Sequence, residues 1–288
     1  MFINRKYHRL LQSLLLTLIG FGLAWALASL PNLIDRANAL STFQGVAQIR
    51  PEQQSAEQLT QLGWQQFHRG EITAALETWR LATQKYRQTK DETGTIGSLV
   101  NESLALRSLG FYPRACSTLL NALNLSQNLC PPVGIASSST IPELLSQLKQ
   151  QPASQVRILA LRSLGTTLRQ IGNLSASEMM LNQALSSAQT VANQDIPSLL
   201  LSLAITEQAQ VKQAQVHYDL AEDYDREVIE LETIETNLEN AIAHYQQAAN
   251  SSQANATIQL QSALNLLRLS RDIDQWVTRY QTFTTPKL

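Results

Sequence analysis

The sequence has few charged residues, and its C-terminal part has almost none of the residues that break helices. Only 16% of the 288 residues are charged, against about a quarter in typical soluble proteins, and the net charge is −1. A nucleic-acid-binding protein normally carries a strongly basic surface, so this class is not expected. No glycine follows Gly172, and no proline lies between Pro197 and Pro286. Long uninterrupted helices are therefore predicted in that part of the chain.

Sequence signatures of catalysis and cofactor binding are also missing. The chain has no glycine-rich phosphate loop and no nucleophile elbow. The four histidines, His8, His68, His217 and His244, lie at none of the spacings that bind a metal. An acidic stretch at 222–232 lacks the central glycine of a calcium loop and is interpreted as a solvated helix face. We therefore predict a protein that is not an enzyme and has no metal site, no cofactor and no catalytic residue.

The first 39 residues have the composition of a targeting segment. Arg5, Lys6 and Arg9 precede an apolar run at 14–30. A basic flank before an apolar core is typical of a secretory signal. The run has 17 residues, which just reaches the lower limit for a helix that crosses a bilayer. The segment at 1–39 is therefore either a cleaved signal peptide or an uncleaved membrane anchor.

Both alternatives lead to the same prediction for location. Small residues at the spacing that signal peptidases accept end at Ala28 and at Ala39. The basic flank keeps the N-terminus inside the cell, so the rest of the chain is expected in the periplasm or outside the cell. Residues 1–39 carry a net charge of +3, which leaves −4 on the exported part.

A polar linker at 40–55 leads into a unit of two amphipathic helices at 56–86. Apolar residues recur at three- and four-residue steps in both halves of this unit, which is helical periodicity. Gly70 lies between the halves, where a left-handed residue ends a helix. The apolar positions of the second half are Ile72, Ala75, Leu76, Trp79 and Ala82.

This unit recurs twice further along the chain. In the second copy, the residues forty positions after Gly70, Ala75, Trp79 and Ala82 are Gly110, Ala115, Leu119 and Ala122. In the third copy, Gly165, Gly172 and Leu181 have the offsets of Gly63, Gly70 and Trp79.

The order of residues in the unit resembles the tetratricopeptide repeat, whose pattern is Leu-Gly, an aromatic residue, then alanine, aromatic and alanine. The resemblance covers 56–185 well and the later residues loosely. The copies depart from the pattern where Ser103 replaces a glycine and where Arg107 and Arg169 replace aromatic residues. The resemblance implies an all-α fold in which helical hairpins stack into a right-handed solenoid. An ordinary helical bundle is the alternative.

Two stretches interrupt the regular spacing. Between the second and third copies an insertion has loop composition, followed by a capping-box pattern at Thr140 and Glu143 that predicts a short helix. Later, a fourth hairpin with two lengthened helices is predicted, with its turn near 223–225, and a last helix follows it. We therefore assign 56–275 to the repeat domain and 276–288 to a C-terminal tail.

Cys116 and Cys130 are the only cysteines and lie 14 residues apart. In an exported protein a pair at this spacing is expected to form a disulfide. Two separate buried thiols are the alternative.

The resemblance also implies a binding site, because the first helices of tetratricopeptide hairpins line a groove that binds peptides. Three arginines and an aromatic patch in this groove could hold an acidic side chain or a C-terminal carboxylate, since guanidinium pairs with carboxylate through two hydrogen bonds. Arginines that are merely solvated are the alternative. The residues expected to face the groove are Trp64, Phe67, His68, Asn101, Leu104, Arg107, Arg162, Thr166 and Arg169.

Two functions fit these patterns. The first is an exported scaffold, not an enzyme, that binds a protein or peptide and stays tethered to the membrane if the segment at 1–39 is an uncleaved anchor. The second follows from a further resemblance, to the N-terminal repeat region of bacterial proteins with a caspase-like CHAT peptidase domain. In that case the chain is the repeat portion of a split or truncated peptidase system, and the domain with the catalytic His–Cys pair lies on another chain or has been lost.

Overall fold

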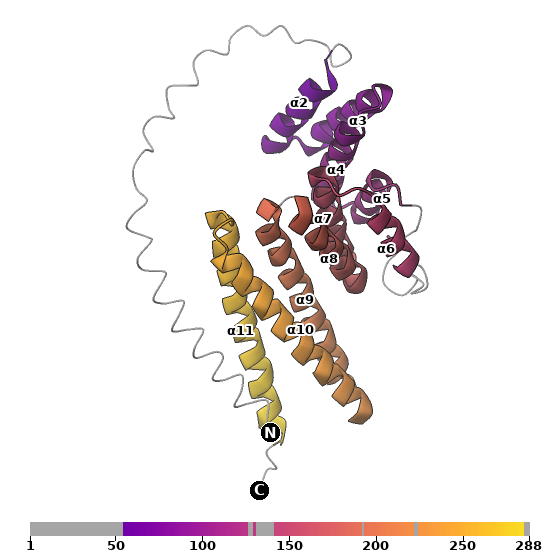
Figure 1. The fold of residues 1–288 in the computed structure, drawn as a ribbon. Helices are drawn as coiled ribbons and strands as arrows, with labels where there is room; N and C mark the ends of the chain where they lie inside the picture. The colour runs from indigo at the N-terminus through magenta and orange to yellow at the C-terminus, as the bar shows by residue number, and fades with distance from the viewer. Residues whose placement is uncertain (1–53, 126–128, 131–140, 192, 222–223, 285–288) are drawn as a thin grey trace, which may run out of the picture. The chain divides into compact units, whose positions relative to one another are not determined.

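The computed structural model describes residues 54–284, apart from 126–128, 131–140, 192 and 222–223. The proposed signal or anchor segment at 1–39 and nearly all of the linker lie outside the described residues. Within the described residues the fold is all-α, with ten α-helices and one short 3-10 helix (Figure 1). The elements are α2 (Ala56–His68), α3 (Ile72–Gln88), α4 (Glu92–Ser108), α5 (Tyr112–Ala122), α6 (Ile141–Gln150), α7 (Gln155–Gln170), α8 (Leu174–Val191), η4 (Asn193–Asp195), α9 (Ile196–Asp219), α10 (Tyr224–Asn250) and α11 (Ala256–Thr284).

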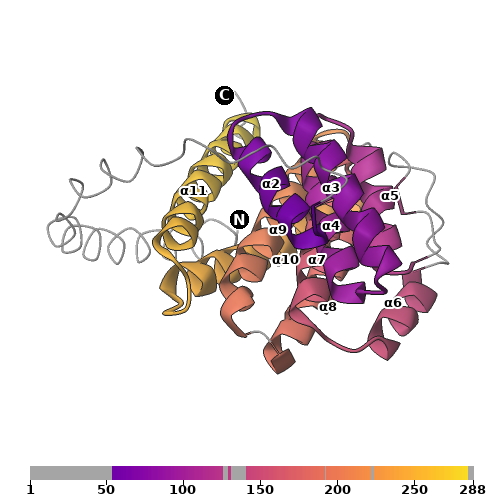
Figure 2. The ribbon, with the colours of Figure 1, turned by 90° about the horizontal axis from the view of Figure 1, so that it is seen from above.

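The helices pack in chain order as hairpins. The hairpins are α2–α3, α4–α5, α7–α8 and α9–α10, and each of these pairs is in contact. Neighbouring hairpins also meet through their first helices, since α4 packs on α7 and α7 packs on α9 (Figures 1 and 2). Side chains on the first helices of successive hairpins are therefore brought near one another.

Contacts within the chain define two units. The first, Arg50–Leu266, contains the helices from α2 to α10 and the beginning of α11. The second combines Met1–Ile49 with Leu267–Leu288, and the structure describes only the rest of α11 in it. α11 continues to Thr284, so most of the stretch that the sequence analysis assigns to the tail is helical. All the sites discussed below lie in the first unit.

The turns between the helices of three hairpins share one backbone geometry. Gly70, Gly110 and Gly172 have φ angles of 82°, 79° and 85°, in the left-handed region that glycine adopts most easily. After each glycine, the next N–H donates to a carbonyl five residues back, as Glu71 does to Gln66 at 2.9 Å. This Schellman closure satisfies carbonyls at the helix end. It confirms the alignment that pairs these three glycines.

A second contact also supports that alignment. A Cβ added to Gly63 on α2 would lie 2.3 Å from Nε1 of Trp79 on α3. A Cβ added to Gly165 on α7 would lie 2.7 Å from Cγ of Leu181 on α8. In both hairpins a glycine on the first helix therefore allows a large side chain of the second helix to pack against its backbone.

The insertion between α5 and α7 belongs to the hydrophobic core. The structure contains the predicted disulfide between Cys116 on α5 and Cys130, with a Cα–Cα distance of 5.7 Å. The predicted short helix is α6, and its buried Leu144 and Leu148 join the same core cluster as Cys116. The disulfide and the leucines of α6 thus hold the insertion against the hairpins.

The fourth hairpin has the lengthened helices that the sequence predicts. α9 has 24 residues and α10 has 27. Its packing is concentrated at one end, where Leu203 of α9 and Ala241 and Tyr245 of α10 are buried. Among the helices that the structure describes, none combines the length and the apolarity needed to span a membrane.

Candidate functional site

Three arginines from two adjacent first helices form the candidate site. Arg107 lies near the end of α4, and Arg162 and Arg169 lie on α7, which packs against α4. All three are half-buried. Burial lowers the pKa of each arginine, since removal from water disfavours the charged form. The positive charges of Arg169 and Arg162 lower the pKa of Arg107 further, in keeping with the packing of α4 on α7.

The three arginines have few compensating partners. Arg107 Nε donates to Gln170 Oε1 at 3.2 Å, and Arg162 Nη1 donates to Ser198 Oγ. Nε of Arg169 is buried and has no hydrogen-bond partner among the described residues. None of the three forms an ion pair with a carboxylate that the structure describes. Partly desolvated cations in this state are suited to bind an anion, which would supply the missing charge and acceptors.

Another arginine on α7 shows the contrast. Arg157 lies five residues before Arg162, and its Nη2 donates to Glu92 Oε1 of α4 at 2.5 Å. Its Nη1 donates to Gln151. Arg157 is therefore neutralised within the fold, as expected of an arginine with a structural role. The arginine cluster, defined here as Arg107, Arg162 and Arg169, lacks such a carboxylate partner.

The surroundings of the cluster come from the fourth hairpin. The charge of Asp195, just before α9, partly offsets the lowered pKa of Arg162. On the other side, Arg169 lies near Tyr245 of α10, whose pKa is raised by burial, so its phenol stays neutral. The Tyr245 hydroxyl donates to Gln208 Oε1 at 2.6 Å. The sequence analysis missed these neighbours because it placed only the first three hairpins along the groove.

The aromatic residues predicted for the groove form a separate cluster on the first hairpin. The ring centroid of Trp64 lies 5.2 Å from that of Trp79 and 5.9 Å from that of Phe67. His68 is exposed and stacks on Trp64 at 5.7 Å. Trp64 and Phe67 pack against a core cluster that includes Leu106, the residue before Arg107. The aromatic cluster therefore packs on α4, the helix that also carries Arg107.

The remaining predicted groove residues offer less to a ligand. Asn101 on α4 is only 9% exposed, so little of its amide is accessible. Leu104 is half-buried. Thr166 Oγ1 donates to the carbonyl of Arg162 within α7 at 2.9 Å. The arginines and the aromatic cluster are therefore the strongest candidates for contacts with a partner.

Among the described residues, no group of three or more His, Cys, Asp or Glu side chains is placed to hold a metal ion. Both cysteines of the chain are in the disulfide, so it has no free thiol.

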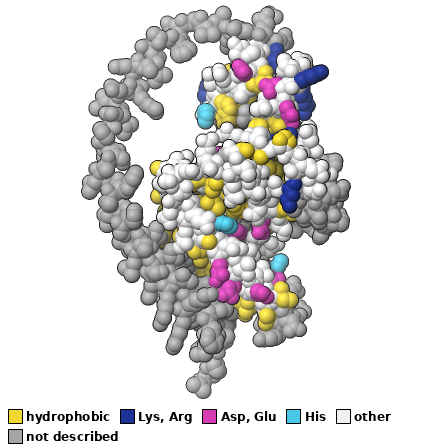
Figure 3. All heavy atoms as spheres, in the orientation of Figure 1, with side chains coloured by type: hydrophobic (Ala, Val, Ile, Leu, Met, Phe, Trp, Pro, Cys, Tyr) yellow, Lys and Arg dark blue, Asp and Glu magenta, His cyan; other side chains and the backbone are white. Residues whose placement is uncertain are grey.

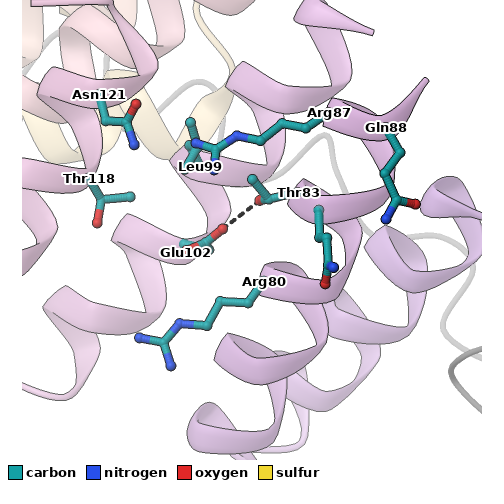
Figure 4. Close-up of a pocket in the computed structure, with 9 residues that line it drawn as sticks. Arg80, Thr83, Arg87, Gln88, Leu99, Glu102, Thr118 and Asn121 are labelled. Atoms are coloured by element: carbon teal, nitrogen blue, oxygen red, sulfur yellow. Dashed lines mark hydrogen bonds between the residues drawn. The ribbon is translucent and has the colours of Figure 1, made fainter. Parts of the chain in front are cut away.

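A second candidate is a polar hollow of about 550 Å³ between α3, α4 and α5. Its centre is Glu102 of α4, which is buried and accepts a hydrogen bond from Thr83 Oγ1 at 2.5 Å (Figure 4). Glu102 and Arg107 are five residues apart, roughly 140° around the helix, so the hollow and the arginine cluster lie on different faces of α4. The other lining residues are Arg80, Gln84, Arg87, Gln88, Leu99, Thr118 and Asn121.

Glu102 is expected to make stability depend on pH. Burial raises the pKa of this carboxyl above its ordinary value, and this effect outweighs the hydrogen bond from Thr83 and the charges of Arg80 and Arg87. Between the two pKa values the folded protein holds the proton more tightly than the unfolded chain does. The free energy of unfolding therefore falls as the pH rises from the ordinary glutamate pKa through the raised one.

Glu102→Gln should remove this pH-dependent decrease in the free energy of unfolding, because glutamine can still accept a hydrogen bond from Thr83 but carries no charge. The variant should have a higher melting temperature than the wild type at pH 7.5, and the difference should shrink at pH 4. Exposed Glu57 on α2, which is not among the groups that shift the pKa of Glu102, serves as the control, and Glu57→Gln should leave the pH profile nearly unchanged. If the melting temperatures of Glu102→Gln and the wild type differ by the same amount at every pH, Glu102 is not the source of the pH dependence.

Comparison of the chain with protein-family models and with curated proteins finds no match.

Proposed function

We propose that this protein is an exported, non-enzymatic scaffold of tetratricopeptide-like repeats. Its first helices line a groove that binds an acidic segment of a protein partner, and the arginine cluster is the anchor. The hairpins stack as a right-handed solenoid in this proposal.

The repeated contacts within the hairpins support the tetratricopeptide part of the proposal. Gly63 against Trp79 and Gly165 against Leu181 occupy the glycine and large-residue positions of the repeat pattern. Packing of α4 on α7 and of α7 on α9 aligns first helices side by side, as a groove requires.

The single observation that carries the binding proposal is the unpaired charge of the arginine cluster. Three half-buried guanidinium groups lie close together, with Nε of Arg169 lacking a partner and no described carboxylate bound to any of them. Placing like charges together in a partly desolvated site is unfavourable unless a group of opposite charge compensates them. A carboxylate of the partner would accept bidentate hydrogen bonds and offset the repulsion.

The aromatic cluster refines the kind of partner. Trp64 and Phe67 are half-buried, so part of each ring remains available to an apolar side chain, and stacked His68 extends the surface. The proposed partner segment thus carries acidic groups for the arginine cluster and an apolar residue for the aromatic cluster. A nucleic acid is not proposed, because the chain after residue 39 is mildly acidic overall.

We further propose that the protein works in the periplasm or outside the cell. The basic flank and the apolar run at 14–30 support export, with this run either removed or retained as a membrane anchor. The disulfide between Cys116 and Cys130 supports the same location, because disulfides persist in oxidising compartments.

The groove is tested by the double variant Arg107→Ala/Arg169→Ala. Immobilised wild-type protein should retain a partner from an envelope extract, and the double variant should lose it. Calorimetry with that partner's binding segment should then show a loss of about 1.5–3 kcal/mol for each charge-assisted hydrogen bond removed, or about ten- to a hundredfold in affinity. Binding should also weaken as salt is raised, because partly exposed charges are screened.

Two other arginines provide matched controls. Arg114 is an exposed arginine on α5, a second helix, and Arg157 is the arginine of α7 that pairs with Glu92. Arg114→Ala and Arg157→Ala should keep the partner. Equal retention by the wild type and the double variant, with both proteins folded, would show that the cluster is not the anchor.

A further inference from the structure

The far end of the α9–α10 hairpin exposes aliphatic side chains. The exposed fractions are 55% for Val216, 68% for Leu220, 43% for Val228 and 62% for Ile229. All four lie within three residues of His217 or Glu230, whose Nδ1 and Oε1 atoms are 3.5 Å apart and link the two helices. The four side chains therefore gather at one end of the hairpin, which we call the hairpin tip.

The described part of the first unit does not bury these aliphatic residues. α9 contacts α7 and α8, and its last buried residues are Val211 and Ala214. On α10 the first buried residue whose side chain is described is Ile234. No described residue between these limits, from Gln215 to Thr233, is buried. Around the hairpin tip the described helices of the first unit bury neither α9 nor α10, and the outward aliphatic residues are exposed.

The same region is strongly acidic. The sequence 216–239 contains nine aspartates and glutamates against one arginine, whereas the whole chain has a net charge of −1. The acidic residues whose side chains the structure describes there are Asp219, Glu230, Glu232, Glu235 and Glu239. Acidic and hydrophobic side chains lie next to one another over the lower end of the hairpin in the view of Figure 3. A purely solvated helix face needs the acidic residues but gains nothing from large aliphatic residues, three of which are more than half exposed here. The combination of the two marks an interaction surface.

We propose that the hairpin tip docks a basic amphipathic helix of another protein. The leucine, isoleucine and valine side chains would bury the apolar face of that helix. Lysines and arginines along its flanks would face the acidic residues, which speeds the encounter and favours basic partners. An anionic membrane and a second copy of this acidic tip are both disfavoured, since each would bring like charges together. This surface is independent of the groove, because it uses none of the groove residues.

The proposal can be tested with a designed probe. The probe is a fluorescein-labelled helical peptide of 18 leucines and lysines with all the leucines on one face, and binding to the full-length protein is followed by anisotropy. A second peptide of the same composition has its leucines spread around the helix. The wild type should bind the amphipathic peptide at least tenfold more tightly than the spread one, because only the first presents a continuous apolar face.

Variants then locate the surface. Leu220→Ser/Ile229→Ser should lower the affinity for the amphipathic peptide at least tenfold. Val191→Ser, at an exposed valine that ends α8, should leave this affinity unchanged. Glu232→Lys should weaken binding less and should reduce its salt dependence. The two serine substitutions lie at exposed positions, and a melting curve checks that the protein is still folded. Arg107→Ala should not alter this binding, so failure here and failure of the groove are distinguishable.

Three outcomes would overturn the proposal. Equal affinity of the wild type for both peptides would show that charge alone drives binding and that the apolar face is not recognised. Unchanged binding to the serine variant would place the peptide elsewhere. A dimer of the wild type that dissociates in the serine variant, or binding to phosphatidylglycerol vesicles that the variant loses, would assign the hairpin tip to a second copy or to a membrane.

Discussion

Replacing Trp79 with alanine is expected to lower the free energy of unfolding by about 3–5 kcal/mol. Trp79 is fully buried between α2 and α3, where its ring contacts Trp64 and Phe67 at centroid distances of 5.2 and 5.7 Å. Its Nε1 also donates to the carbonyl of Thr60 at 3.2 Å. Alanine would leave a cavity at the centre of the first hairpin. Urea denaturation followed by circular dichroism measures the change.

Gly63 provides a control, because its backbone lies directly against the Trp79 ring. Gly63→Ala should destabilise the wild type, since its Cβ would lie 2.3 Å from Trp79 Nε1. The same substitution should cost much less in the Trp79→Ala background, where the space is empty, so the two effects should not add. Trp64→Ala should cost less than Trp79→Ala, because Trp64 is half-exposed. A loss below 1 kcal/mol for Trp79→Ala would contradict the described packing.

Removal of the disulfide is expected to cost about 3 kcal/mol on the chain-entropy model for a loop of about 15 residues. Cys116 and Cys130 are bonded and buried in the core cluster that contains Leu144 and Leu148 of α6. Without the bond the unfolded chain gains freedom, and the insertion is held by leucine packing alone. The difference between denaturation curves of wild type and Cys116→Ser/Cys130→Ser gives the value.

Alkylation of the denatured protein without reductant provides the matching chemical test. In protein taken from the envelope, the alkylating reagent should label neither cysteine, and after prior reduction it should label both. Full labelling without reduction would contradict both the bond and the proposed location in an oxidising compartment. Unchanged stability of the double serine variant would show that leucine packing alone fixes the insertion.

Local patterns in the sequence predicted most of the fold. The three turn glycines, the short helix of the insertion and the lengthened fourth hairpin each depend on interactions between residues near one another in the chain. A left-handed glycine ends a helix through hydrogen bonds within six residues, so Gly70, Gly110 and Gly172 could be recognised without the structure. The disulfide could be predicted because its two cysteines are only 14 residues apart and have no competitors.

The sequence by itself therefore determined the helices, their pairing into hairpins and the choice of Arg107, Arg162 and Arg169 as neighbours. Only the tertiary structure decided the state of these side chains. The burial and the electrostatic surroundings of each arginine depend on which residues of other hairpins lie against it. Examples are Gln170 beside Arg107 and Tyr245 near Arg169. For the same reason the aliphatic residues of the hairpin tip look like core positions in the sequence. They are exposed because the described helices of the first unit do not cover that end of the hairpin.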